Sequence, residues 1–177
     1  MNKEHNVLDL FCGCGGLSKG FQEVGFNIVG GIDINQEAID TFNENFKNSK
    51  GLCCDISKLS KEDIEKNFGN IGKIDVIIGG PPCQGFSSAN RQKMDSDPRN
   101  KLFFQFVKFV DLIKPKVVVI ENVRGIVTQD NGYAKNKIYE IFNTRGYTVT
   151  HKILDASDYG VPQKRLRNFF VITKGVD

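Results

Sequence analysis

Short apolar runs alternate with longer segments of helical periodicity along this chain, and the alternation limits the fold more than any other feature. The strand-like runs cover residues 6–11, 27–33, 51–55, 74–80, 116–122, 147–155 and 168–174. The segments with apolar residues at helical spacing cover residues 17–25, 36–46, 60–68 and 101–114. This pattern is typical of a parallel sheet with helices on both faces. We therefore expect an α/β domain with a doubly wound, mostly parallel sheet and an antiparallel pair of strands at one edge.

Length and composition indicate one ordinary domain, which we expect to span residues 1–177. No apolar run is long enough to cross a membrane, and the first residues do not resemble an export signal. The net charge of +3 permits a nucleic acid as partner without requiring one. The five cysteines lack CxxC spacing and no histidine lies near them, so we expect no metal site.

A glycine cluster follows the first predicted strand, in the stretch DLFCGCGGLSKGF (9–21). Its members Gly13, Gly15 and Gly16 allow a tight turn into a helix and close approach of a ligand to the backbone. Asp33, at the end of the second predicted strand, suits the hydroxyl pair of a ribose. The pattern predicts an adenosine-type cofactor site, although Ser18 replaces the third glycine of the dinucleotide fingerprint. Asp55 ends the third strand and has two readings, a contact to the adenine amino group or a helix-start cap.

The stretch GGPPCQGFS (79–87) places Cys83 directly behind two prolines, after the fourth predicted strand. In a doubly wound sheet the first and fourth strands commonly flank the point where the winding reverses, and ligands bind there. We therefore expect Cys83 and the glycine cluster to face one crevice. Pro81 and Pro82 have a fixed φ and no N–H group, so they hold the turn rigid. This setting favours a reactive cysteine over one that fills the core.

Glu121 ends the fifth predicted strand, after the run VVVI (117–120). It is either an exposed strand end or a partly buried acid with a raised pKa, and the neighbourhood of Cys83 favours the second reading. Basic residues gather in two loops, where a solvated charged surface is the usual explanation. They are Arg91, Lys93, Arg99 and Lys101 in one loop, and Lys164, Arg165 and Arg167 in the other.

These stretches together resemble the cytosine-5 DNA methyltransferases. DLFCGCGG resembles the first cofactor motif of that family, GGPPCQGFS its nucleophile motif, ENV (121–123) its acid motif and DYGVPQKRLR (158–167) its arginine motif. The motifs occur in the family's order over almost the whole chain. The resemblance implies a Rossmann-like S-adenosylmethionine-dependent methyltransferase fold. It also implies methyl transfer to carbon 5 of a flipped-out cytosine in double-stranded DNA, in the prokaryotic cytoplasm as part of a restriction-modification system.

The resemblance also implies a role for each matching residue. Cys83 adds to carbon 6 of the cytosine, Glu121 protonates ring nitrogen 3, and Arg165 and Arg167 hold the carbonyl oxygen of the base. The cofactor is expected to touch Phe11, Gly13, Gly15, Gly16, Asp33, Ile34, Asp55, Ile56, Pro82 and Leu102. The base or the DNA is expected to touch Gln84, Ser87, Arg91, Arg99, Asn122 and Val123. Ile34 stands where the family often has an aromatic residue.

Members of the family normally continue past the arginine motif into a target-recognition region and closing motifs. This sequence stops ten residues after Arg167, so we expect a catalytic half that needs a second subunit or a C-terminal segment. A relative acting on transfer RNA is a competing reading, although that branch typically has threonine where Ser87 stands. A noncatalytic cofactor-binding subunit is the third reading, which the intact Cys83, Glu121 and Arg167 disfavour.

Overall fold

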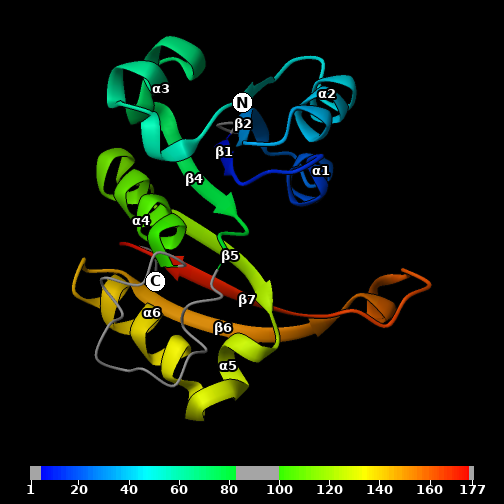
Figure 1. Ribbon diagram of the computed structural model, residues 1–177, viewed down its shortest axis with the longest axis vertical. Coiled ribbons are helices and arrows are strands. Elements are labelled where there is room, and N and C mark those ends of the chain that lie inside the picture. Colours follow the sequence, from blue (N-terminus) through cyan, green and yellow to red (C-terminus); the bar gives the residue numbers. More distant parts are fainter. Residues whose placement is uncertain (1–4, 83–99, 176–177) are drawn as a thin grey trace.

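The computed structural model describes residues 5–82 and 100–175, and a seven-stranded sheet forms its centre (Figure 1). The strands are β1 (Asn6–Leu10), β2 (Asn27–Asp33), β3 (Lys50–Cys53), β4 (Ile74–Gly79), β5 (Val117–Val123), β6 (Thr148–Asp155) and β7 (Leu166–Thr173). Their order across the sheet is β3-β2-β1-β4-β5-β7-β6. The first five strands are mutually parallel, whereas β7 runs antiparallel to both β5 and β6. The predicted mostly parallel sheet with an antiparallel edge pair is confirmed.

Helices cover both faces of the sheet and make three layers (Figure 1). The α-helices are α1 (Gly16–Glu23), α2 (Gln36–Asn45), α3 (Lys61–Phe68), α4 (Lys101–Ile113), α5 (Gly125–Thr128) and α6 (Tyr133–Asn143). The 3₁₀ turns are η1 (Ile56–Lys58), η2 (Ile71–Lys73), η6 (Gln129–Gly132) and η7 (Ala156–Tyr159). One hydrophobic cluster joins α3, α4 and α6 to the sheet, and a second joins α1 and α2 to the opposite face. Over the described ranges, no helix is long and apolar enough to cross a membrane.

Helix α6 is an element that the sequence analysis did not predict. Its buried residues are Ala134, Ile138, Ile141 and Phe142, which recur at the i, i+4, i+7, i+8 spacing of an amphipathic helix. The signal was therefore present in the sequence. The polar residues Lys135, Asn136 and Lys137 interrupt the apolar pattern and hide it from a reading that looks for continuous apolar runs.

The winding of the sheet reverses between β1 and β4, which are neighbours although α1, β2, α2, β3 and α3 separate them in the chain. Because β1, β2, β3, β4 and β5 are parallel, their carboxyl ends meet at one edge of the sheet. Ligands of doubly wound proteins bind at such an edge. At the antiparallel end of the sheet, the connection between β6 and β7 projects away from the body as an arm (Figure 1).

Gly79 allows β1 and β4 to lie close together at this edge. It is paired with Leu10 in the sheet register, and a β-carbon at Gly79 would collide with the carbonyl oxygen of Leu10. The obstacle is backbone rather than a flexible side chain, so a larger residue has to push the two strands apart. The absence of a side chain at Gly79 thus keeps the two central strands in register beside the ligand edge.

We predict that Gly79→Ala lowers the free energy of unfolding by about 1–3 kcal/mol, the usual cost of overpacking. Urea unfolding followed by circular dichroism measures the effect. Gly20→Ala is the matched control, because Gly20 lies exposed in α1 with no atom near an added β-carbon. The control should keep or gain stability, by up to about 1 kcal/mol. Equal stability of the Gly79 variant and the wild type would contradict the prediction.

Candidate active site

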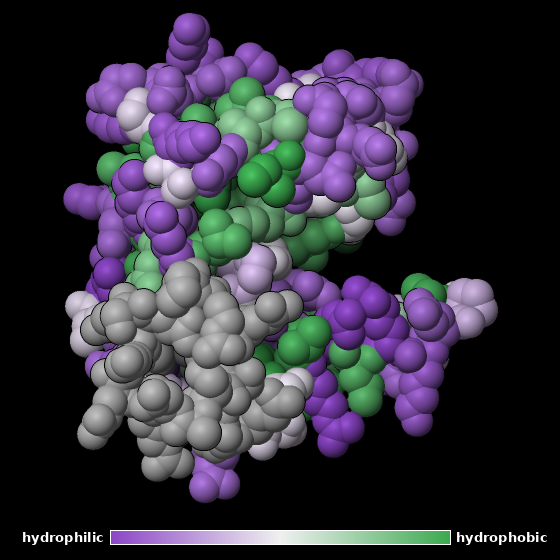
Figure 2. Space-filling view, viewed as in Figure 1, coloured by the Kyte–Doolittle hydropathy of each residue, from purple (hydrophilic) through white to green (hydrophobic). Residues whose placement is uncertain are grey.

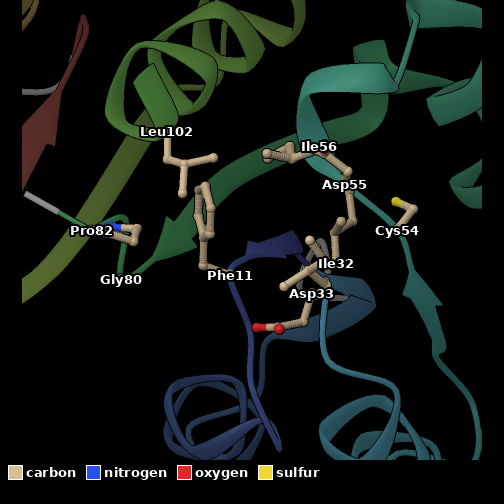
Figure 3. Close-up of a pocket in the computed structure, with 10 residues that line it drawn as sticks. Phe11, Ile32, Asp33, Cys54, Asp55, Ile56, Gly80, Pro82 and Leu102 are labelled. Carbon is tan, nitrogen blue, oxygen red and sulfur yellow. The ribbon is translucent and has the colours of Figure 1, made fainter. Parts of the chain in front are cut away.

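A pocket of about 310 Å³ opens at the carboxyl ends of the parallel strands. In the space-filling view, apolar residues gather in the hollow between the α3–α4 side and the α1–α2 side of the molecule (Figure 2). The pocket is lined by Phe11, Ile32, Asp33, Ile34, Cys54, Asp55, Ile56, Gly80, Pro82 and Leu102 (Figure 3). Most of the residues expected to touch the cofactor are therefore brought together, from segments as far apart in the chain as Phe11 and Leu102. Ile32, Cys54 and Gly80 are lining residues that sequence reasoning did not select.

Phe11 lines the pocket together with Leu102 and Ile56. Its ring points toward the side chain of Leu102 (Figure 3). Its φ of 62° lies in the left-handed region, which is costly for a residue with a β-carbon and is concentrated at functional sites. This backbone turn, directly after β1, directs the aromatic ring into the pocket.

Asp33 fixes the glycine turn from the end of β2. Its Oδ2 accepts a hydrogen bond of 2.9 Å from the backbone N–H of Gly13, and its Oδ1 accepts one of 3.0 Å from the backbone N–H of Asn35. The carboxylate is thereby held at the pocket wall (Figure 3). Each carboxylate oxygen has a further lone pair, so Asp33 can still accept from a ligand.

The three glycines of the turn do different things. Gly13, with φ 53°, and Gly16 have open space where a β-carbon would stand, so their lack of a side chain leaves room beside the backbone. Gly15, with φ 89°, is the N-cap residue of α1, and a β-carbon there would collide with the rings of Phe42 and Phe46. Gly15 is therefore required by helix entry and core packing, and none of the three is among the residues that line the pocket.

Asp55 has the capping role, which is one of the two readings that the sequence left open. Its side chain caps η1 by accepting from the backbone N–H of Ser57 at 2.9 Å and from the Ser57 hydroxyl at 2.7 Å. These hydrogen bonds lower the pKa of the Asp55 carboxyl, so it is ionised at neutral pH. The same residue lines the pocket next to Ile56. The capping role is confirmed, and a ligand contact at this position stays a prediction.

Ile34 lies at the mouth of the pocket and is 73% exposed. It belongs to the turn between β2 and α2. A contact between Ile34 and the cofactor stays a prediction. An exposed branched aliphatic residue supplies apolar area there but no aromatic face for stacking.

Glu121 is partly buried at the carboxyl end of β5 and forms an ion pair with Arg167 of β7, with 3.0 Å between Nε and Oε1. The pairing of Val123 with Arg167 places Glu121 and Arg167 diagonally on one face of the antiparallel ladder, within reach of long side chains. Gly80 lies against Glu121, because a β-carbon at Gly80 would stand 3.3 Å from Oε2. Since Gly80 also lines the pocket, the pocket and the Glu121–Arg167 pair adjoin.

The remaining expected site residues divide into three groups. Cys83, Gln84, Ser87, Arg91 and Arg99 lie outside the described residues, which resume after Pro82 at Asn100. Arg165 and Val123 are exposed, with Val123 at 54%, and the backbone N–H of Arg165 donates to Asp155 at 3.0 Å. Asn122 is buried, and its carboxamide donates to the carbonyl oxygen of Pro81 at 3.0 Å. Asn122 thus holds the turn that precedes Cys83 in the chain.

Two other cysteines near the pocket are poor nucleophiles. Burial raises the pKa of the Cys12 thiol above its usual range and that of the Cys54 thiol to about 11. Both are therefore protonated at neutral pH, and a thiolate is the reactive form of cysteine. Among residues 5–82 and 100–175, no group of three or more His, Cys, Asp or Glu residues is arranged to hold a metal ion.

Asp9 is a buried carboxyl that sequence reasoning missed, although an acidic residue inside the apolar run VLDLF (7–11) was a signal. It is 1% exposed, and its Oδ2 accepts a 2.6 Å hydrogen bond from the hydroxyl of Ser18, which lies in the first turn of α1. Burial raises its pKa to about 7, the Ser18 hydrogen bonds oppose the shift, and the charge of Asp33 adds to it. Helix α1 has no side-chain cap of its own, so Asp9 supplies from β1 a contact that anchors the helix start.

We predict that Asp9 makes the fold less stable as the pH rises from about 4 to about 7. Its pKa is higher in the folded chain than in the unfolded one, so the folded state binds more protons in this range and the free energy of unfolding decreases. The slope is at most about 1.4 kcal/mol per pH unit. Urea unfolding across this range measures it. Asp9→Asn should remove this contribution from the slope, whereas Asp40→Asn, on the exposed face of α2, should keep it. The same slope in the Asp9 variant would refute the assignment.

The sequence matches the family model described as C-5 cytosine-specific DNA methylase over residues 5–176. Among curated relatives, the type II methyltransferase M.DdeI of Desulfomicrobium norvegicum is 45% identical over 170 residues, which cover 94% of this chain and 40% of the relative. The type II methyltransferase M1.HphI of Haemophilus parahaemolyticus is 42% identical over 166 residues, which cover 93% of this chain and 44% of the relative.

A solved structure shares the fold. The crystal structure of a candidate DNA modification methyltransferase encoded within a prophage (E. coli) superposes with a TM-score of 0.81 at 39% identity. The match covers 97% of this chain and 47% of that protein. The chain thus spans less than half the length of these proteins, and the expected Rossmann-like methyltransferase fold is confirmed.

Proposed function

This chain belongs to the C-5 cytosine-specific DNA methylase family, and we propose that it transfers a methyl group from S-adenosylmethionine to carbon 5 of cytosine in double-stranded DNA. The observation that carries the proposal is the junction at Gly80, where the pocket adjoins the Glu121–Arg167 pair. The description of the family supports DNA as the substrate, and the type II methyltransferase names of the relatives support a restriction-modification system as the setting. The family description favours this reading over a relative that acts on transfer RNA.

The described pocket fits S-adenosylmethionine by its chemistry. Phe11, Ile56 and Leu102 offer apolar surface for an adenine ring, and Asp33 offers a carboxylate for ribose hydroxyls. The open space beside Gly13 and Gly16 leaves room for a polar chain near backbone N–H groups at the start of α1. When bound, S-adenosylmethionine supplies an electrophilic methyl group on sulfur.

In the proposed reaction, the residues of this chain prepare the cytosine. The thiolate of Cys83 adds to carbon 6 of the ring, which makes carbon 5 nucleophilic. Glu121 donates a proton to ring nitrogen 3 and so neutralises the charge that the addition creates. After methyl transfer, a base removes the proton of carbon 5, and the electron pair of that C–H bond expels the thiolate and restores the double bond. Ring nitrogen 3 then returns its proton to Glu121, and the products are 5-methylcytosine and free Cys83.

Arg167 holds Glu121 through their ion pair at the carboxyl end of β5. In the proposal it also faces the carbonyl oxygen of the base, together with Arg165. A base inside a duplex cannot enter such a site, so the cytosine has to be flipped out of the helix. Gln84, Ser87, Arg91, Arg99 and Val123 are proposed to contact the base or the surrounding DNA.

The reading of a particular DNA sequence is proposed to lie in a region that these 177 residues do not contain, because the matched relatives are more than twice as long as the matched part. The region is either a continuation of the same chain or a second subunit. Basic side chains alone give salt-dependent contact with phosphates and carry no sequence information. Activity assays therefore compare the chain with and without the C-terminal half of a relative.

We predict that Cys83→Ser abolishes methyl transfer and leaves cofactor binding intact, because a hydroxyl is a far weaker nucleophile at neutral pH. Mass spectrometry of 5-methylcytosine in DNA measures the first effect, and calorimetric titration with S-adenosylmethionine measures the second. Cys14→Ser is the matched control, since Cys14 is exposed and does not line the pocket. Substantial turnover by the Cys83 variant would rule out the covalent mechanism.

We predict that Glu121→Gln slows the chemical step, because an amide cannot donate an acidic proton and cannot form the ion pair with Arg167. General acid catalysis typically contributes about 10²–10⁴-fold, so a loss of that order is expected in the single-turnover rate. Rapid-quench measurements with saturating cofactor and DNA isolate this step. An unchanged rate would remove Glu121 from the mechanism.

A further inference from the structure

Asn168 is a fully buried amide in the middle of β7. It is 0% exposed, and neither its Oδ1 nor its Nδ2 has a hydrogen-bond partner in the described part of the structure. Its neighbours on the same face of β7, Phe170 and Ile172, are fully buried apolar residues of the core. A buried polar group without a partner is costly, whereas an apolar residue of similar size would carry no such cost. An amide at position 168 therefore lowers the stability of the fold, and packing of the core does not require it.

The residue opposite Asn168 is Asn122 of β5. Directly paired residues of antiparallel strands have β-carbons about 4.5–5.5 Å apart, so the two carboxamides lie within reach of each other after a side-chain rotation. Asn122 uses one N–H of its Nδ2 for Pro81, and its Oδ1 accepts from the backbone N–H of Val123 at 2.9 Å. A carboxamide has two N–H donors. The second N–H of Asn122 and the unpaired Oδ1 of Asn168 are complementary.

The Asn122 carboxamide is in turn connected to the pocket. It holds the carbonyl oxygen of Pro81, and the residues on both sides of Pro81, Gly80 and Pro82, line the pocket. The Asn122 carboxamide is thus linked to the pocket wall by one hydrogen bond, the one that it donates to Pro81. Strand β7 supports both neighbours at the end of β5, because Arg167 pairs with Glu121 on one face and Asn168 lies opposite Asn122 on the other.

We propose that Asn168 is a positioning residue of the cofactor site: it pairs with the carboxamide of Asn122 when the ligand is bound and so fixes the Gly80–Pro82 wall of the pocket. The inference rests on the proposed function, because the ligand is the methyl donor or its product. A ligand that favours the paired arrangement draws part of its affinity from the new hydrogen bond. Asn168 then stabilises the ligand-bound state and lowers the stability of the ligand-free protein.

The test is a double-mutant cycle on Asn168→Leu and Asn122→Leu in the 177-residue chain. Two quantities are measured, the midpoint of urea unfolding without ligand and the affinity for S-adenosylhomocysteine by NMR titration. Asn168→Leu should raise the midpoint, because it removes an unpaired buried amide. It should weaken binding about fivefold, the factor expected of one neutral hydrogen bond. Asn122→Leu should also weaken binding, and adding Asn168→Leu to it should cause no further loss, because the two residues act as one unit.

Ile172→Val is the control, since Ile172 is buried on the same face of β7 but farther from the pocket. It should lower the midpoint slightly and leave the affinity unchanged. A higher midpoint with unchanged affinity in Asn168→Leu would overturn the proposal, as would a fall in both quantities, which indicates a purely structural amide. A wild-type chain that does not bind S-adenosylhomocysteine would refute the proposed function and this inference with it. Wild-type binding with additive losses in the double variant would overturn the inference alone.

Discussion

The parallel pairing of β1 with β4 is the constraint on which the rest of the site depends. It brings the glycine turn, which follows β1, next to the Gly80–Pro82 turn, which follows β4. Nearly seventy residues separate these turns in the chain, and the backbone contact at Gly79 leaves no room for a side chain between the strands. Adjacent strands of a sheet lie about 4.8 Å apart, so two turns that leave neighbouring strands necessarily share one crevice. The pocket forms in that crevice.

The antiparallel strand β7 completes the site from the other side. A sixth parallel strand beside β5 would begin at the opposite edge of the sheet and would reach the ligand edge only with its last residues. Because β7 runs in the opposite direction, its first residues meet the last residues of β5, and Arg167 reaches Glu121. The departure from a purely parallel sheet thus has a direct consequence for the chemistry: it delivers a cation to the carboxyl edge.

Three residues near the carboxyl edge of the sheet depart from what packing alone would select. Asp9 lies under the start of α1 with one oxygen lacking a hydrogen-bond partner among the described residues. Phe11 adopts a left-handed backbone conformation. The buried carboxamide of Asn122 donates a hydrogen bond to the backbone of the turn that follows β4. Such costs are tolerated in a protein when the surrounding structure is well packed, as the two hydrophobic clusters on either face of the sheet are here. The concentration of these groups at one edge agrees with a functional site there.

The sequence by itself determined the doubly wound sheet, the glycine turn, the place of Asp33 and the family, because each of these depends on local periodicity or on residues close together in the chain. It also contained the signal for α6, which polar residues obscured. Only the tertiary structure decided that Gly80 joins the pocket to Glu121, that Gly15 serves packing and that Asp9 is buried under Ser18. It likewise decided that Asn168 lies opposite Asn122. The physical reason is that these contacts depend on strand register and on the docking of helices against the sheet, which join segments far apart in the chain and leave no pattern in the local sequence.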